Sequence, residues 1–290
     1  MQRSSRPSPA VIVGVDGSPA SIDAALWAVP EAVDREIPLR LIYSIEDSDT
    51  RLGASRPFGQ DSGTADTAIR SAIAAIESTN QPVKIESEIT HGQATSALLA
   101  ASRSAAIVCI GALGRNGAAG RHGGSTAANL LSRAQHPVAV IRRAPPTAAT
   151  HSQWIVAEFD GDPAGTAVME RAVDEARLRD APLRVLTRWQ PVFTDIHDTR
   201  GAADGKRMTK ANLERSLERW RRSYPEVDIE AVAVCGSVLG YVACNVESIQ
   251  LVVVGSHRRD GLAEFVGPAA NAALHGTNCS LLILERQRPL

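Results

Sequence analysis

The sequence contains one pattern twice, at an offset of 144 residues, so the chain must fold as two similar domains. Val-Asp16-Gly-Ser-Pro near the start corresponds to Phe-Asp160-Gly-Asp-Pro, and Gly111 corresponds to Gly255. Further along the chain the offset falls to 143, which indicates that one residue is missing from the loop at 255–267 of the second copy. A register kept over this length is rarely a product of chance, and duplication is the simplest interpretation.

The length of the chain agrees with two domains, because 290 residues exceed one typical domain of about 100–200 residues. Between the copies lies a stretch that contains Pro-Pro and is otherwise mostly small or polar, which is typical of a linker. We therefore predict domains at residues 1–143 and 154–290, joined by a linker at 144–153.

Each copy alternates short apolar runs with segments of helical periodicity and lacks hairpin turns. This alternation favours an α/β fold: two tandem Rossmann-like domains, each a parallel, doubly wound sheet flanked by helices. In the first copy we predict strands near 11–15, 39–45, 83–89, 106–111 and 138–142. Predicted helices lie near 19–36, 65–79, 93–104 and 125–135. Residues 46–64 and 190–205 are expected to be surface loops.

Charge and cysteine usage exclude several classes of protein. Lys and Arg number 31 against 32 Asp and Glu, so the chain lacks the basic excess of a nucleic-acid or anionic-membrane binder. No apolar run approaches the ~18 residues of a membrane span, and residues 1–9 have no apolar stretch, so we expect neither a membrane span nor a secretory signal. The four cysteines show no C-x-x-C spacing; Cys235 and Cys244 are expected to be buried thiols. We expect a reduced, cytoplasmic protein.

A glycine-rich loop follows the fourth predicted strand and carries the clearest chemical signal. It has the spacing Gly111-x2-Gly114-x9-Gly124-Ser-Thr126 and runs into a predicted helix. Glycines let backbone N–H groups approach an anion, and a helix N-terminus favours negative charge. The hydroxyl groups at the end of the loop can donate hydrogen bonds, and Arg115 can neutralise a phosphate. The loop can therefore hold a polyphosphate in a chain of neutral net charge.

Asp16 directly follows the first predicted strand, and Gly111 ends the fourth. In open parallel sheets, ligands bind beyond the carboxyl ends of the strands where strand order reverses. If these two strands are neighbours at that point, Asp16 can accept a hydrogen bond from a ribose while the loop holds phosphates. The alternatives are a flexible loop without a ligand, with Asp16 and Ser125 serving only as helix caps and Arg115 as a solvated charge.

These motifs resemble the ATP-binding signature of the universal stress protein family, over both halves of the chain. The resemblance implies a five-stranded parallel sheet in each domain and pairing of the two domains through their last strands. Association of two chains into a homodimer stays open. It also implies that ATP, with Mg, binds the first domain. Gly14, Val15 and Asp16 would line the ribose and adenine side, and Ile45 would face adenine. The residues that would hold the phosphates are Gly111, Gly114, Arg115, Gly124, Ser125 and Thr126.

The second copy departs from this signature. Arg258 stands where the middle glycine belongs, and Gly267 is followed by Pro268 and Ala269 in place of Ser and Thr. Proline has no N–H and neither residue has a hydroxyl group. We therefore predict that the second domain binds ATP poorly or not at all and serves as a structural partner of the first.

Several catalytic classes are excluded, since the chain has no G-x-x-x-x-G-K-[ST] and no G-x-S-x-G motif. No base is evident that would activate water at a γ-phosphate, so we expect a binding protein with little or no turnover and not an enzyme. The resemblance implies a regulatory role in stress. Two alternatives stay open: an interaction module that binds no nucleotide, and a weak ATPase or phosphotransfer enzyme.

Overall fold

The computed structural model describes residues 9–46, 58–114, 125–134, 136–142, 153–159, 161, 163–190, 199–255, 264–265 and 268–284. It divides into a first unit, Met1–Pro145, and a second unit, Pro146–Leu290. These bounds lie close to the predicted domains, and most of the predicted linker lies outside the described residues.

The first unit is built on a parallel sheet with the strand order β3-β2-β1-β4-β5. Its strands are β1 (Ala10–Gly14), β2 (Leu39–Ile45), β3 (Ile85–His91), β4 (Ala105–Gly111) and β5 (Val138–Ile141). The central strands are apolar and almost completely buried, as a sheet covered on both faces requires. The five strands lie where the apolar runs predict them, with ends that shift by at most two residues.

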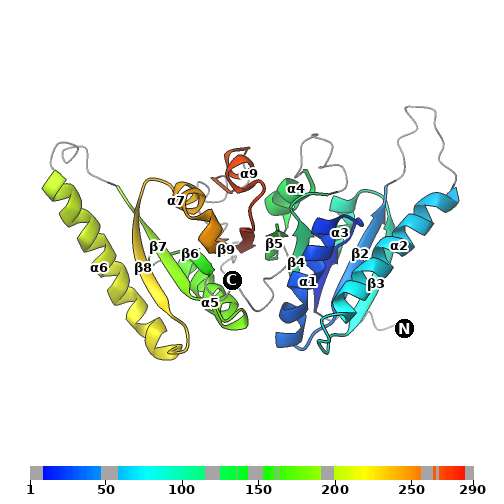
Figure 1. The fold of residues 1–290 in the computed structure, drawn as a ribbon, viewed down its shortest axis with the longest axis horizontal. Helices are drawn as coiled ribbons and strands as arrows, with labels where there is room; N and C mark the ends of the chain where they lie inside the picture. The colour runs from blue at the N-terminus through cyan, green and yellow to red at the C-terminus, as the bar shows by residue number, and fades with distance from the viewer. Residues whose placement is uncertain are drawn as a thin grey trace, which may run out of the picture. The chain divides into compact units, whose positions relative to one another are not determined.

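Four helices cover this sheet: α1 (Pro19–Asp34), α2 (Phe58–Glu77), α3 (Ala94–Ser102) and α4 (Ser125–Arg133) (Figure 1). α1 packs against α2, and α3 packs against α4. Because crossovers are right-handed and the strand order reverses between β1 and β4, the two pairs cover opposite faces. The predicted doubly wound α/β architecture is confirmed.

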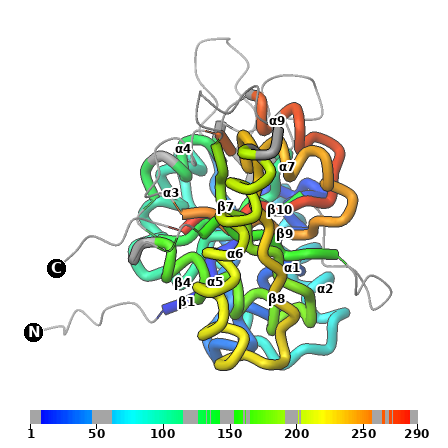
Figure 2. Tube along the Cα trace, turned by 90° about the vertical axis from the view of Figure 1, so that its left-hand side faces the viewer, coloured from blue at the N-terminus to red at the C-terminus, as the bar shows by residue number. Residues whose placement is uncertain are grey.

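The second unit repeats this architecture with the strand order β10-β9-β6-β7-β8. Its strands are β6 (Trp154–Glu158), β7 (Leu183–Trp189), β8 (Ile229–Cys235), β9 (Ile249–Gly255) and β10 (Ser280–Leu284). Its helices are α5 (Pro163–Leu178), α6 (Thr199–Ser223), α7 (Val238–Cys244), the short 3₁₀ helix η4 (Val246–Ser248) and α9 (Pro268–Leu274). α6 runs along β8 and β7, as Figure 2 shows.

Two helices begin earlier than the sequence predicts. α2 begins at Phe58 and α6 at Thr199, so the predicted surface loops at 46–64 and 190–205 are wrong in their last residues. Both helices start with segments that contain glycine and polar residues, which are weak helix formers in isolation. Later turns of each helix bury apolar side chains, among them Ile69 and Leu217, and this packing stabilises the whole helix.

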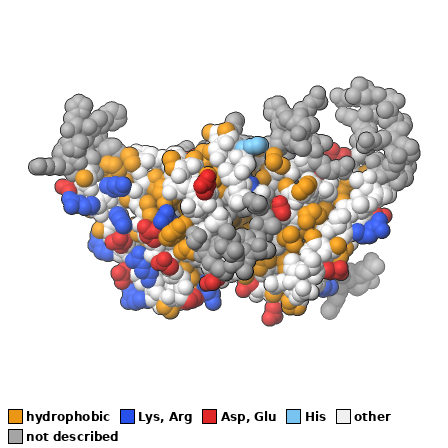
Figure 3. Space-filling model, in the orientation of Figure 1, with side chains coloured by type: hydrophobic (Ala, Val, Ile, Leu, Met, Phe, Trp, Pro, Cys, Tyr) orange, Lys and Arg blue, Asp and Glu red, His pale blue; other side chains and the backbone are white. Residues whose placement is uncertain are grey.

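The exposed side of α6 is strongly charged. Arg215, Arg219 and Arg222 are exposed, while Leu213 and Leu217 are buried against the sheet. Basic and acidic side chains lie side by side over this part of the second unit in Figure 3. The helix is therefore amphipathic, and its charges form a solvated face.

The prediction that Cys235 and Cys244 are buried is wrong. Both are exposed free thiols, whereas Cys109 and Cys279 are buried. Cys235 is the last residue of β8 and Cys244 the last of α7, so both lie where an element leaves the core. The apolar residues around these cysteines in the sequence do not show that the two side chains are exposed.

One ion pair between neighbouring strands occurs in both units. Arg40 on β2 lies 3.0 Å from Glu86 on β3, and Arg184 on β7 lies 2.9 Å from Glu230 on β8. The members of each pair are directly opposite in the strand register, and the two pairs differ by 144 residues at both positions. The duplication therefore extends to side-chain contacts. In the second unit Arg184 also lies over the ring of Trp154, 3.7 Å from its centroid.

The ion pair of the first unit predicts a dependence of stability on pH. Hydrogen bonds from Lys84 and then Arg40 lower the pKa of Glu86 below its ordinary value of 4.5. A lowered folded-state pKa adds stability above the unfolded-state pKa, and that stability is lost as the pH falls through the folded-state value. We expect wild type to be more stable than Glu86→Gln at neutral pH and the difference to vanish in acid. Urea unfolding over a pH series measures it.

Glu88→Gln on the same strand removes the same charge from an exposed residue and serves as the control. If the difference in unfolding free energy between wild type and Glu86→Gln stayed constant far below pH 4.5, the ion pair of Glu86 would not be its source.

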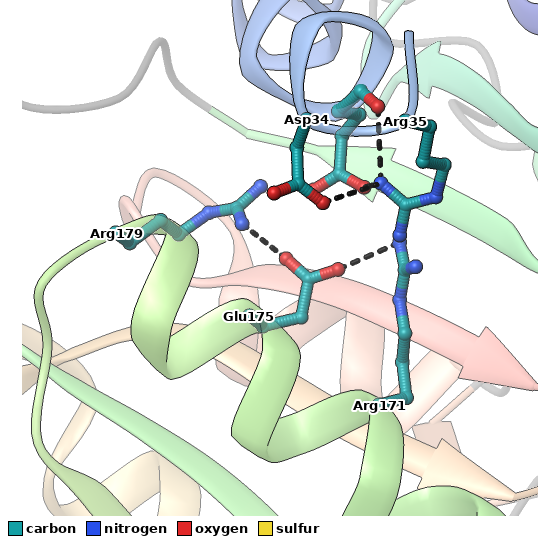
Figure 4. Close-up of polar contacts among 6 residues, drawn as sticks. Asp34, Arg35, Arg171, Glu175 and Arg179 are labelled. Atoms are coloured by element: carbon teal, nitrogen blue, oxygen red, sulfur yellow. Dashed lines mark hydrogen bonds and ion pairs between the residues drawn. The ribbon is translucent and has the colours of Figure 1, made fainter. Parts of the chain in front are cut away.

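A second duplicated pair lies on α1 and α5. Glu31 is fully buried on α1 and pairs with Arg35 at 2.8 Å. At an offset of 144, Glu175 is 1% exposed on α5 and lies between Arg171 and Arg179, both of which form ion pairs with it (Figure 4). Each helix therefore carries a buried carboxylate whose charge is balanced by arginine one turn away.

Candidate functional site

The candidate site lies at the carboxyl ends of β1 and β4. β1 pairs with β2 on one side and with β4 on the other, and all these pairings are parallel. The strand order reverses between β1 and β4, because β2 and β3 continue to one side and β5 to the other. The strand that precedes Asp16 and the strand that ends at Gly111 are therefore neighbours, as a shared ligand site at this edge requires.

Asp16 is held in one orientation by the start of α1. Its Oδ1 atom accepts hydrogen bonds from the Ser18 N–H at 2.9 Å and the Ser18 hydroxyl at 2.6 Å. Gly17 between them has φ +80°, a left-handed conformation that favours glycine. Ser18 is the N-cap of α1, and its side chain accepts a hydrogen bond from the Ser21 N–H. Asp16 therefore supports the helix cap without being the cap itself.

Gly111 and Gly114 bring the loop after β4 close to Asp16 and to the start of α1. A Cβ atom at Gly111 would lie 2.6 Å from the backbone carbon and oxygen of Ala20, a distance that no side chain tolerates. At Gly114 a Cβ atom would lie 2.9 Å from Asp16 Oδ2. A larger residue would therefore clash at either position. Because both residues are glycines, the backbone of the loop can lie next to the carboxylate of Asp16.

The other predicted residues lie at the same edge of the sheet or outside the described residues. Gly14 ends β1, and the N–H of Val15, which is buried, donates to Ile42 O at 2.8 Å. Ile45 ends β2 and is also buried. α4 begins at Ser125, and Thr126 in its first turn is half-buried. Arg115 and Gly124 lie outside the described residues, as does the side chain of Ser125.

Ser18 was missed by the sequence analysis as a part of the site, although its place two residues after Asp16 in a helix-start motif is a usable signal. The other missed residues lie in the second unit. They are Glu158, Arg188 and Glu264, which form a network at the carboxyl edge of its sheet. Comparing the two copies residue by residue reveals two of them, because Glu158 corresponds to Gly14 and Arg188 to Ser44.

Arg188 links the two carboxylates of this network. Its Nε atom donates to Glu158 Oε1 at 2.6 Å, and its Nη2 atom donates to Glu264 Oε2 at 2.8 Å. Burial alone would lower the pKa of Arg188, but the hydrogen bond to Glu158 and the charges of both carboxylates outweigh burial and raise this pKa above its ordinary value. Arg188 is therefore permanently charged.

The start of α9 bears on the prediction for the second domain. α9 begins at Pro268, which has no N–H to donate, whereas the corresponding helix α4 begins at Ser125. Asp160, Arg258 and Gly267 lie outside the described residues. Poor nucleotide binding by this domain stays a prediction.

Comparison with known proteins gives the family. The family model described as the universal stress protein family matches residues 9–142 and again residues 153–285. The chain belongs to the universal stress protein family. Two universal stress proteins of Mycobacterium tuberculosis are among its relatives. One is 38% identical over 287 residues, 99% of each chain, and the other is 42% identical over 257 residues, 87% of this chain and 90% of the relative.

Among solved structures, a universal stress protein from Archaeoglobus fulgidus matches with a TM-score of 0.67 over 96% of each chain. At 13% sequence identity this likeness supports the α/β fold of the family and nothing finer. None of the helices in the described residues is long and apolar enough to cross a membrane.

Proposed function

We propose that the first unit binds ATP, with Mg, at the carboxyl edge of its sheet, and that the chain acts as a regulatory nucleotide-binding protein with little or no turnover. The observation that carries this proposal is the adjacency of β1 and β4 at the point where the strand order reverses. It brings Asp16 beside Gly114, so an acceptor for ribose hydroxyls and a phosphate-binding loop share one edge.

The chemistry of these residues suits a nucleotide. The N-terminus of α4 follows the loop, and the N–H groups of a first helical turn, which have no acceptor within the helix, favour phosphate oxygens together with the helix dipole. Arg115 and a bound Mg ion would balance the remaining charge. Asp16 accepts two hydrogen bonds at Oδ1, which orients the carboxylate as a hydrogen-bond acceptor. This role agrees with binding rather than with activation of water.

The second unit has a structural role in this proposal, as the permanent partner of the first in a pseudo-dimer within one chain. Its helix α9 begins with proline, and charged residues stand at the positions of Gly14 and Ser44. We further propose that the protein acts in the cytoplasm, because none of its cysteines forms a disulfide.

Calorimetric titration of nucleotide-stripped protein with Mg-ATP tests the proposal by its stoichiometry. We expect about one site per chain. Two sites would show that Arg258 and Pro268 are compatible with binding and that the second unit is not degenerate. Absence of binding would overturn the proposal and favour a protein-interaction module. Release of phosphate during the titration would favour the weak ATPase.

A further inference from the structure

The carboxyl edge of the second unit carries charged side chains at positions where the first unit has small residues. Glu158 ends β6 as Gly14 ends β1, and Arg188 stands near the end of β7 as Ser44 does in β2. Counted back from Gly267 and Gly124, Glu264 corresponds to Arg121 of the glycine-rich loop. The loop position with a basic side chain in one copy therefore has an acidic one in the other.

Glu264 makes contacts of the kind that an anionic ligand makes. Its Oε2 atom accepts from Arg188 at 2.8 Å, and its Oε1 atom accepts from the backbone N–H of Leu239 at 3.0 Å. Leu239 lies in the first turn of α7, where N–H groups have no partner within the helix. The side chain of Glu264 is only 13% exposed. Its carboxylate therefore accepts hydrogen bonds from a guanidinium and from an N–H of a helix start in a largely buried place.

Glu158 is the second carboxylate bound to Arg188. Its side chain is 8% exposed, and it accepts the Nε–H of Arg188 at 2.6 Å. The three side chains carry a net charge of −1, with both carboxylates bonded to the same arginine. A phosphate brought to this edge would meet two carboxylates and an arginine already engaged, and would be repelled.

We propose that Glu264 is a built-in anion of the second unit. Its carboxylate accepts the hydrogen bonds of Arg188 and of the Leu239 N–H that a ligand anion would otherwise accept, so these donors need no nucleotide. The comparison with a ligand rests on the proposed function of the first unit, but the contacts themselves do not. The second unit therefore keeps one state whether or not nucleotide is present.

Amide hydrogen exchange, read residue by residue by NMR on the full chain, tests this proposal. In Glu264→Ala the Leu239 amide loses its acceptor, and we expect its exchange to become at least about tenfold faster. The neighbouring Gly240 amide donates to the Ser237 hydroxyl at 2.8 Å and is expected to change less. Formate supplies a free carboxylate, and it should slow the Leu239 exchange of the variant again, relative to sodium chloride at equal ionic strength.

Glu226→Ala is the matched control, because Glu226 lies in the same unit and pairs with Arg177 at the surface, where both side chains are about half exposed. This variant should leave Leu239 exchange unchanged with and without formate. Glu264→Gln keeps the shape of the side chain and removes its charge. It should speed Leu239 exchange by a smaller factor, and it replaces Glu264→Ala if the alanine variant does not fold.

Unchanged Leu239 exchange in both Glu264 variants would overturn the proposal. Faster exchange that formate does not reverse would overturn it too, since Glu264 would then act only as part of the packing. The result is independent of ATP titration of the wild type: failure of the chain to bind nucleotide would remove the proposed function and leave the exchange experiment intact.

Discussion

Gly114→Asp is expected to weaken Mg-ATP binding by about 100-fold or more, which corresponds to about 2.7 kcal/mol. The Cβ atom of the new side chain would lie 2.9 Å from Asp16 Oδ2, so a second carboxylate would stand at the proposed phosphate position. Two like charges about 4 Å apart repel by several kcal/mol near a protein surface, which is enough for this loss. Calorimetric titration of wild type and variant measures the change.

Gly63→Asp provides the matched control. Gly63 is exposed on α2, and a Cβ atom there would meet nothing within 4 Å. This variant adds the same charge to the same unit at an exposed position without contacts, so its affinity should equal that of the wild type. Equal affinity in Gly114→Asp, with circular dichroism and melting unchanged, would show that the loop after β4 does not hold the phosphates.

The largest loss of stability is expected from Glu175→Ala on α5. Glu175 is 1% exposed and pairs with Arg171 at 2.7 Å and with Arg179. The substitution removes the carboxylate that both mostly buried guanidinium groups contact. Breaking a buried ion pair in this way lowers the unfolding free energy by about 3–5 kcal/mol. Urea unfolding followed by tryptophan fluorescence should show this loss of unfolding free energy.

Two further variants separate charge from packing. Glu175→Gln keeps the volume of the side chain and should lose most of the same stability. Glu226→Ala removes a carboxylate from a half-exposed pair with Arg177, and such pairs contribute about 0–1 kcal/mol. A cost for Glu175→Ala as small as that of Glu226→Ala would mean that the arginines find other acceptors.

The strands were predictable because a parallel sheet buried on both faces requires continuous apolar runs, and runs such as Val11-Ile-Val and Ile107-Val-Cys are unambiguous. The start of α2 was not, since glycine and aspartate in its first turns favour a loop locally and only tertiary packing favours the helix. The prediction of buried thiols at Cys235 and Cys244 failed for a related reason: apolar neighbours in the sequence do not show which way a side chain points at the end of a strand or a helix.

At the candidate site the sequence predicted the two strands whose carboxyl ends it uses, and in the second unit it missed a network of charged side chains. Asp16 and Gly111 follow from strand positions and spacing, because the carboxyl ends of parallel strands share one edge. The ligand roles of the individual residues stay predictions. The contacts of Glu264 with Arg188 and Leu239 join segments far apart in sequence, so pattern reading within either segment does not reveal them.

The presence of both copies in one polypeptide has an evolutionary consequence. In a symmetric homodimer every substitution appears in both subunits, because one gene encodes them. Here the two copies are encoded separately and can differ: the ion pairs Arg40–Glu86 and Arg184–Glu230 occur in both, whereas Gly14 of β1 corresponds in the repeat to Glu158 of β6. Gene fusion thus removed the constraint of symmetry, and mutations could specialise one copy without altering its twin.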